Sequence, residues 1–165
     1  MGTRLITGCC DSTGAAIYVI LGQVPVFARV RFPEDAHSNE YLYEWSPEMA
    51  EVSGCDEGWL YTNGIPAPVN ANGISAYNGG DEIVFDKTTN NRWEDSAGNS
   101  VEEKYVDGHN KESETGLAFR CYGNAKNDNP YHGEKVTTGK GFVIGATDPP
   151  NTDGEKIIWE AWIDE

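Results

Sequence analysis

The sequence predicts an all-β fold: an antiparallel β-sandwich or a jelly-roll-like small barrel, with at most one short helix at about residues 46–52. Val, Ile, Tyr, Trp and Gly are plentiful among the 165 residues and Leu is scarce, a bias that suits half-buried strands. Turn signals separate short apolar runs at intervals of about 8 to 12 residues, as in sandwiches and barrels. No repeat or linker is visible, so we expect a single domain over residues 1–165.

The first two strands are expected on either side of Gly22 and Gln23. Residues 15–21 and 24–32 are apolar runs, and glycine at the first position of a two-residue loop is typical of a type II′ hairpin. Every even-numbered residue from Val24 to Phe32 is apolar, which predicts one core-facing side. Pro25 indicates that this end of the strand lies at a sheet edge.

One helix and several reversals complete the predicted order. Ser46 as N-cap, Pro47 at the first helical position and Gly54 after the end predict the helix. The pairs Asn63-Gly64, Asn72-Gly73 and Asp107-Gly108 favour type I′ turns. Residues 157–163 also fit a helical stripe, but their branched and aromatic side chains favour a strand. The other strands are predicted at residues 41–45, 59–62, 82–85, 100–106, 117–122 and 142–146.

The charge balance restricts the partners. The chain carries 27 acidic and 12 basic side chains, a formal charge of −15, which repels nucleic acid and anionic membranes. No run approaches the roughly 20 apolar residues that span a bilayer. The first residues also lack the basic start and apolar core of a secretory signal. We therefore expect no nucleic-acid or membrane partner, and a protein made and kept in a cytoplasm.

The cysteines do not indicate a metal site or a disulfide framework. Cys9, Cys10, Cys55 and Cys121 follow no CxxC spacing, and buried thiols are the expectation in a reducing compartment. Adjacent Cys9 and Cys10 should point to opposite faces of an extended segment, so they are poorly placed to hold one metal ion. A zinc site that recruits a histidine is the alternative, from among His37, His109 and His132.

No catalytic motif is present, so we expect a protein that is not an enzyme and uses no cofactor. Phosphate-binding glycine loops, HExxH and GxSxG are all missing. Asp56 and Glu57 beside Cys55 would raise the pKa of that thiol and disfavour a nucleophilic thiolate. The acidic and amide clusters at 107–110, 127–129 and 148–153 could hold calcium, but none has EF-hand spacing, and solvated loops explain them.

Two functional classes remain. The first is a structural assembly protein, such as a bacteriophage capsid decoration (cement) protein or a tail accessory subunit, located in the virion. Its partners would be the major capsid protein or other virion proteins, and it would form a homo-oligomer, with a trimer favoured. The terminal segments 1–12 and 157–165 are the expected contact arms, and deleting either should leave the domain folded. The contact candidates are Arg4, Leu5, Ile6, Trp159, Trp162 and Ile163.

The alternative is a carbohydrate-binding β-sandwich or the receptor-binding tip of a fibre. The chain holds more large aromatic side chains than one small core would be expected to bury, so some should meet a partner. Trp59 and Tyr61 should share one face of a strand. With Trp93 they would form a platform for sugar rings, and Asn63, Asn91 and Asp95 would supply hydrogen bonds.

Overall fold

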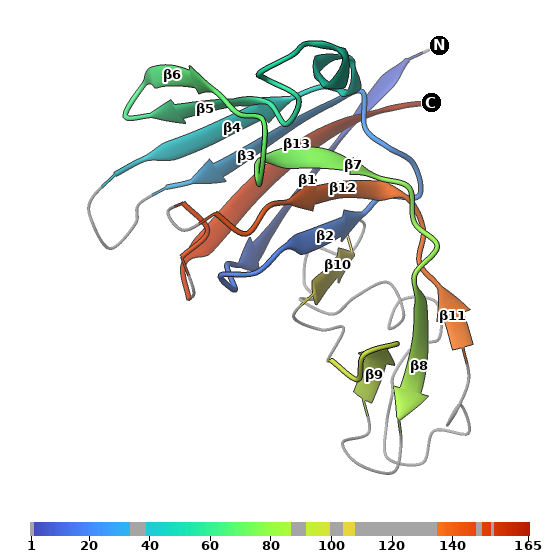
Figure 1. Ribbon diagram of the computed structural model, residues 1–165. Helices are drawn as coiled ribbons and strands as arrows, with labels where there is room; N and C mark the ends of the chain where they lie inside the picture. The colour runs from blue at the N-terminus through green and yellow to red at the C-terminus, as the bar shows by residue number, and fades with distance from the viewer. Residues whose placement is uncertain are drawn as a thin grey trace.

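The computed structural model describes residues 2–33, 39–86, 92–99, 104–107, 135–147, 150–152 and 154–165. These residues form strands and one short 3₁₀ helix, η1 (Pro47–Glu51), so the all-β prediction is confirmed (Figure 1). The strands are β1 (Thr3–Asp11), β2 (Ile17–Ile20), β3 (Phe27–Phe32), β4 (Tyr41–Trp45), β5 (Trp59–Thr62), β6 (Ile65–Pro68), β7 (Ile74–Tyr77), β8 (Glu82–Asp86), β9 (Arg92–Asp95), β10 (Tyr105–Asp107), β11 (Lys135–Thr137), β12 (Gly141–Ile144) and β13 (Lys156–Asp164).

The strands are arranged in three sheets. A six-stranded sheet has the order β1-β13-β3-β4-β5-β6 and is antiparallel throughout. A four-stranded sheet, β10-β2-β12-β7, packs on one of its faces, and β10 runs parallel to β2 as the exception to the antiparallel pattern. The small sheet β11-β8-β9 extends from one end of this sandwich (Figure 1).

The core lies between the two larger sheets. Trp159 of β13 meets Phe142 of β12 edge to face, with ring centroids 6.0 Å apart, and both side chains are almost fully buried. Gly8 is the register partner of Trp159, and a Cβ atom at Gly8 would lie only 2.1 Å from the indole ring. The indole therefore covers the bare backbone of the edge strand, which requires glycine at this position. The indole N–H groups of Trp45 and Trp159 have no hydrogen-bond partner among the described residues.

The hairpin predicted around Gly22 is wrong. Strand β2 belongs to the four-stranded sheet and β3 to the six-stranded sheet, so the chain crosses between the layers of the sandwich. Gly22 does adopt a positive φ of 89°, but the N–H groups of Leu21 and Gly22 both donate to the Lys140 carbonyl. Pro25 lies in the crossover and not at a strand edge. The predicted burial alternation is confirmed where β3 begins, because Ala28, Val30 and Phe32 are fully buried.

Most other local predictions are confirmed. Strands β4 and β5 have the predicted bounds, the last segment is a strand, and the helix after Ser46 is present as a 3₁₀ turn. Asn63 and Gly64 have φ angles of 49° and 82° and connect β5 to β6, as a type I′ turn requires. Asn72 also has a positive φ, but the chain there enters β7 without forming a hairpin. The strand predicted at 117–122 lies outside the described residues.

The two terminal segments expected as contact arms are strands of the six-stranded sheet, β1 at its edge and β13 inside it. Strands β1 and β13 pair with each other along nine residues each, and β13 also pairs with β3 near the centre of the sheet. Ile157, Trp159, Ala161 and Ile163 supply one row of the core. Removing 157–165 would therefore split the sheet and expose the core, so we no longer expect a folded domain after that deletion.

Candidate functional site

The six-stranded sheet has one face in the core and a second face that no described strand or helix covers. We call this second surface the open face. Its side chains alternate with the core side chains along every strand. Leu5 on the edge strand β1 and Ile158 on its neighbour β13 are 48% and 45% exposed. The open face comprises Leu5, Thr7, Cys9, Asp11, Phe27, Arg29, Arg31, Leu42, Glu44, Trp59, Tyr61, Pro66, Pro68, Lys156, Ile158, Glu160, Trp162 and Asp164.

Arg29 organises the middle of the open face. Its guanidinium donates to the Glu44 carboxylate on β4 at 2.8 Å and lies 3.6 Å from the Glu160 carboxylate on β13. The same guanidinium carbon lies 5.9 Å from the Phe27 ring centroid and 6.0 Å from that of Trp162. These rings contact each other edge to face, with centroids 5.2 Å apart. Three strands are thus tied together by side chains that remain accessible, which pre-organises this surface for contact.

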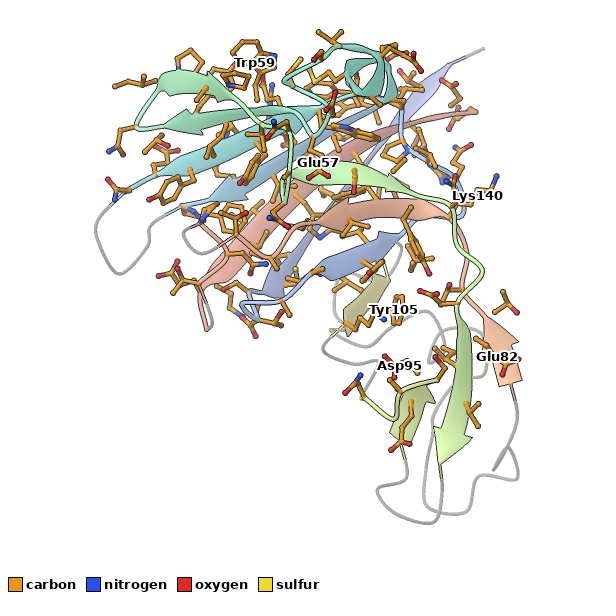
Figure 2. All side chains as sticks on the ribbon, viewed as in Figure 1. Glu57, Trp59, Glu82, Asp95, Tyr105 and Lys140 are labelled. Atoms are coloured by element: carbon orange, nitrogen blue, oxygen red, sulfur yellow. The ribbon has the colours of Figure 1, made fainter. Side chains whose placement is uncertain are left out.

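The aromatic side chains of the open face continue onto the outer strands. Trp59 pairs with Glu44 on one side and Pro68 on the other, and Tyr61 pairs with Leu42 and Pro66. Trp59 lies on the outer part of the sheet in Figure 2. Partial burial and the neighbouring Glu44 carboxylate both raise the pKa of Tyr61, so its hydroxyl stays protonated at neutral pH. The prediction that Trp59 and Tyr61 share one face is confirmed.

The open face is nearly neutral on a strongly acidic chain. It carries three basic and four acidic side chains, a net charge of −1 against −15 for the whole protein. The basic members are Arg29, Arg31 and Lys156, and the acidic members are Asp11, Glu44, Glu160 and Asp164. Most of these charges are paired across strands, including Lys156 with Asp11. A surface with balanced charge and exposed apolar side chains has the composition of a contact surface.

A second polar cluster lies where the four-stranded sheet meets the small sheet. The Asp81 carboxylate accepts hydrogen bonds from the hydroxyls of Tyr77 (2.7 Å) and Tyr105 (2.5 Å), and the Tyr77 hydroxyl also contacts Thr138 Oγ1 at 2.7 Å. The bond from Tyr105 and then that from Tyr77 lower the pKa of Asp81, whereas burial and the bond to Asp81 raise the pKa of Tyr105 far above its ordinary value. Protons therefore stay on the tyrosines, and the cluster fixes the small sheet to the sandwich.

A pocket of about 360 Å³ opens beside this cluster. The Lys104 ammonium lies 3.5 Å from the Asp95 carboxylate and about 5 Å from the ring centroids of Tyr18 and Tyr105. Burial acts to raise the pKa of Asp95, but hydrogen bonds from Asn99 and from the Ala97 backbone, together with Lys104, lower it overall. These partners satisfy the Asp95 carboxylate. Its lining consists of Thr13, Ala15, Ala16, Tyr18, Asp95, Asn99 and Lys104.

The contact candidates named from the sequence divide between the two faces of the sheet. Leu5 and Trp162 lie on the open face as neighbours across β1 and β13, and Arg4 is exposed. The choice of Ile6, Trp159 and Ile163 as contact residues is wrong, because these side chains are only 8%, 1% and 4% exposed and form part of the core. Alternation along a strand places neighbours on opposite faces, so only alternate side chains of a terminal segment belong to the open face.

The three aromatic residues proposed as a sugar platform do not come together. Trp59 and Tyr61 lie on β5 of the six-stranded sheet, whereas Trp93 belongs to β9 of the small sheet at the far end of the molecule (Figure 1). Among the proposed hydrogen-bonding groups, the Asn63 amide already donates to Asn39 and accepts from the Glu40 N–H. Asp95 accompanies Trp93 in the small sheet, and Asn91 lies outside the described residues.

Only some of the cysteines and of the candidate metal-binding residues lie in the part of the chain that the structure describes. Cys10 and Cys55 are buried as expected, while Cys9 is exposed, so the adjacent pair does point to opposite faces. The described residues contain no group of three or more His, Cys, Asp or Glu side chains arranged to hold a metal ion. Cys121, the three histidines and most of the proposed calcium-binding loops fall outside the described part of the chain.

The residues at the centre of the open face were not predicted from the sequence. Phe27, Arg29 and Glu44 were not named as site residues, although the alternation in residues 24–32 already placed Arg29 on the side away from the core.

No family model, curated protein or solved structure matches this chain. No helix in the described residues is both long enough and apolar enough to cross a membrane.

Proposed function

We propose that this protein is a non-enzymatic assembly protein that docks on a larger protein particle through the open face. The form we favour is a viral capsid decoration protein, with the major capsid protein or another virion protein beneath the open face. The observation that carries the proposal is the uncovered face of the six-stranded sheet, where exposed Leu5 and Ile158 accompany the fixed cluster around Arg29.

Interface chemistry supports this proposal. Aromatic residues and arginine contribute most of the binding energy in protein interfaces, and the open face holds Phe27, Trp59, Tyr61 and Trp162 around two arginines. Its charges are balanced within the face, so docking does not bring the acidic character of the chain against the partner. The carboxylates of Asp81 and Asp95, by contrast, are engaged in structural hydrogen bonds.

Incorporation into particles tests the proposal. Particles would be purified by density gradient from cells infected with the virus that encodes the chain, and the protein would be quantified relative to the shell protein. We expect a fixed ratio in the particle fraction, and a loss of about tenfold or more for the double variant Trp59→Ala and Tyr61→Ala. Val52→Ala is the matched control, because Val52 is 53% exposed but lies outside the open face.

Circular dichroism would first establish that both variants remain folded. If the protein stays at the top of the gradient with the free proteins, the assembly proposal fails. Equal incorporation of the wild type and the Trp59 and Tyr61 double variant would instead show that the protein contacts the particle through another surface.

A sugar-binding function is the second candidate, and the accessible pair of Trp59 and Tyr61 favours it. Two rings on one face of a strand can stack against successive rings of a polysaccharide. Binding to a glycan array that is lost in Trp59→Ala and kept in Trp93→Ala would support a platform limited to β5. Absence of binding across the array would leave the assembly proposal as the explanation of these residues.

A further inference from the structure

The two edges of the six-stranded sheet differ in their backbone chemistry. At one edge, hydrogen bonds near both ends of β1 fix which residues point towards β13. The Ser12 N–H donates to the Glu155 carbonyl at 2.7 Å, and the Gly2 carbonyl accepts from the Glu165 N–H at 2.9 Å. Because bonding direction alternates along an antiparallel strand, the even-numbered residues of β1 face β13. Leu5, Thr7 and Cys9 therefore direct their N–H and C=O groups to the outer edge, where no strand of the described residues pairs with β1.

The opposite edge is closed to further pairing. The Val69 N–H donates to the Gly58 carbonyl at 2.9 Å, so the same alternation points the backbone of Ala67 towards β5 and that of Pro66 and Pro68 outwards. Proline has no N–H to donate, which makes β6 a poor template for an added strand. Strand β1 lacks two of the usual protections, because it is nine residues long and contains no proline.

We propose that the β1 edge pairs with β1 of a second copy of this chain, antiparallel about a two-fold axis through Thr7. In this register Thr7 meets Thr7, and Leu5 of each copy meets Cys9 of the other. All of these residues point their backbone groups outwards, so each pair exchanges two N–H···O hydrogen bonds across the seam. The two six-stranded sheets become one continuous sheet whose open faces lie on the same side.

The exposed apolar side chains of β1 and its lack of net charge both support this pairing. Leu5 is 48% exposed and Cys9 is exposed, and in the dimer these apolar side chains would cover each other beside Trp162. Strand β1 carries one basic and one acidic side chain, so its net charge is zero on a chain of −15. The seam therefore brings together two strands without net charge, which add little to the repulsion between the acidic copies.

The same features limit assembly to two copies. Pairing of β1 with β6 would build an open fibre, but Pro66 and Pro68 remove the donors that such a contact requires. Self-pairing of β1 uses up the edge that accepts a strand. A closed dimer is thus proposed in place of the trimer expected from the sequence. The seam uses the β1 backbone and the open-face side chains of Leu5 and Cys9, so Ile158 and the cluster around Arg29 remain available for docking.

A proline substitution at the centre of the seam tests the proposal. Sedimentation velocity should show a dimer for the wild type and a monomer for Thr7→Pro, because the Thr7 N–H points away from β13 and its loss breaks only the seam. Thr7→Val keeps that N–H and should remain a dimer. Unchanged β-type circular dichroism in Thr7→Pro would establish that the monomer is folded. A monomeric wild type at all accessible concentrations, or an oligomer that persists in a folded Thr7→Pro variant, would overturn the proposal.

A cross-link tests the register and is useful even if Thr7→Pro does not fold. Opposed residues in this register have Cα atoms about 5.5 Å apart, within the range of a disulfide. Oxidation of Leu5→Cys should therefore join Cys9 to the new thiol of the second copy and give a covalent dimer on non-reducing electrophoresis. The double variant Leu5→Cys and Cys9→Ser should lose the specific product. No covalent dimer from Leu5→Cys would refute the register. Particle incorporation can fail while this cross-link forms, so the two proposals are tested separately.

Discussion

The two faces of the six-stranded sheet are built from the same strands but have different chemistry. On the inner face, Trp159, Val30 and Tyr43 pack against the four-stranded sheet and are almost completely buried. On the open face, the register neighbours Glu160, Arg29 and Glu44 form ion pairs that remain accessible. Burial accounts for the inner residues, since it removes apolar surface from water. The ordered rings and exposed aliphatic side chains of the open face gain little from the fold itself, which is why we assign them to a contact.

Two tryptophans of β13 that lie on opposite faces should show the largest difference in their contribution to stability. Trp159→Ala should lower the free energy of unfolding by about 3–5 kcal/mol, because it leaves a large cavity against Phe142 and Gly8. Trp162→Ala should cost about 1 kcal/mol, the scale of its edge-to-face contact with Phe27. Urea unfolding of the two variants measures both values. Equal losses would contradict the distinction between the faces.

Alkaline titration should distinguish buried Tyr43 from Tyr61, which is only partly buried. Burial, and then the charge of Glu57, raise the pKa of Tyr43 from 10.0 to about 12. Its contribution to stability is therefore fully present below the unfolded pKa of 10.0 and is lost as the pH rises through about 12, a loss of up to about 3 kcal/mol.

Urea unfolding measured between about pH 9 and pH 12 gives the slope of stability against pH. Tyr43→Phe should reduce this slope, since the phenol that must ionise on unfolding is gone. Tyr61→Phe, on the open face, is the matched control and should change the slope less. The prediction fails if the wild type and Tyr43→Phe lose stability in parallel.

The ion pairs of the open face should matter little for folding. Arg29→Gln removes the bonds to Glu44 and Glu160 but leaves an accessible amide, so we expect a loss of about 1 kcal/mol or less. This loss should shrink in high salt, because solvent ions screen exposed charges. Thermal unfolding at low and high ionic strength measures it. A loss as large as that of Trp159→Ala would mean that Arg29 holds the fold and not a contact surface.

The smallest effect is expected for an exposed aliphatic residue. Ile158→Thr should change the free energy of unfolding by less than about 0.5 kcal/mol, since Ile158 is 45% exposed and threonine suits a strand. Ile157→Thr is the matched change on the inner face, where it places a hydroxyl in the core, and should cost well over 1 kcal/mol. If Ile158→Thr and Ile157→Thr lose similar free energies of unfolding in urea, then Ile158 is buried in the folded protein and the open face is not exposed to solvent.

Local patterns in the sequence were enough for the elements that depend on neighbouring residues. Strands β4 and β5, the turn at Asn63 and Gly64, and the alternation along β3 follow from residue types at fixed spacing, and the structure has them as predicted. Strands β6 and β7 were not predicted from the sequence. Strand β6 contains Pro66 and Pro68, which disfavour a strand, and β7 is a four-residue strand with too few apolar residues to show a clear alternation. The terminal strand β1 was interpreted as an arm for a similar reason, since Gly8 and the adjacent cysteines interrupt its pattern.

The sequence by itself determined an all-β chain and which residues of each strand share a side, because strand propensity and alternation are local properties of the polypeptide. Only the tertiary structure decided which strands are neighbours: β2 and β3 separated into different sheets, and β13 was placed between β1 and β3. Those pairings join residues far apart in the chain, and burial of the shared core selects them. The same pairings brought Arg29 between two glutamates and left β1 at a free edge, so the candidate surfaces arise from tertiary contacts and not from any motif.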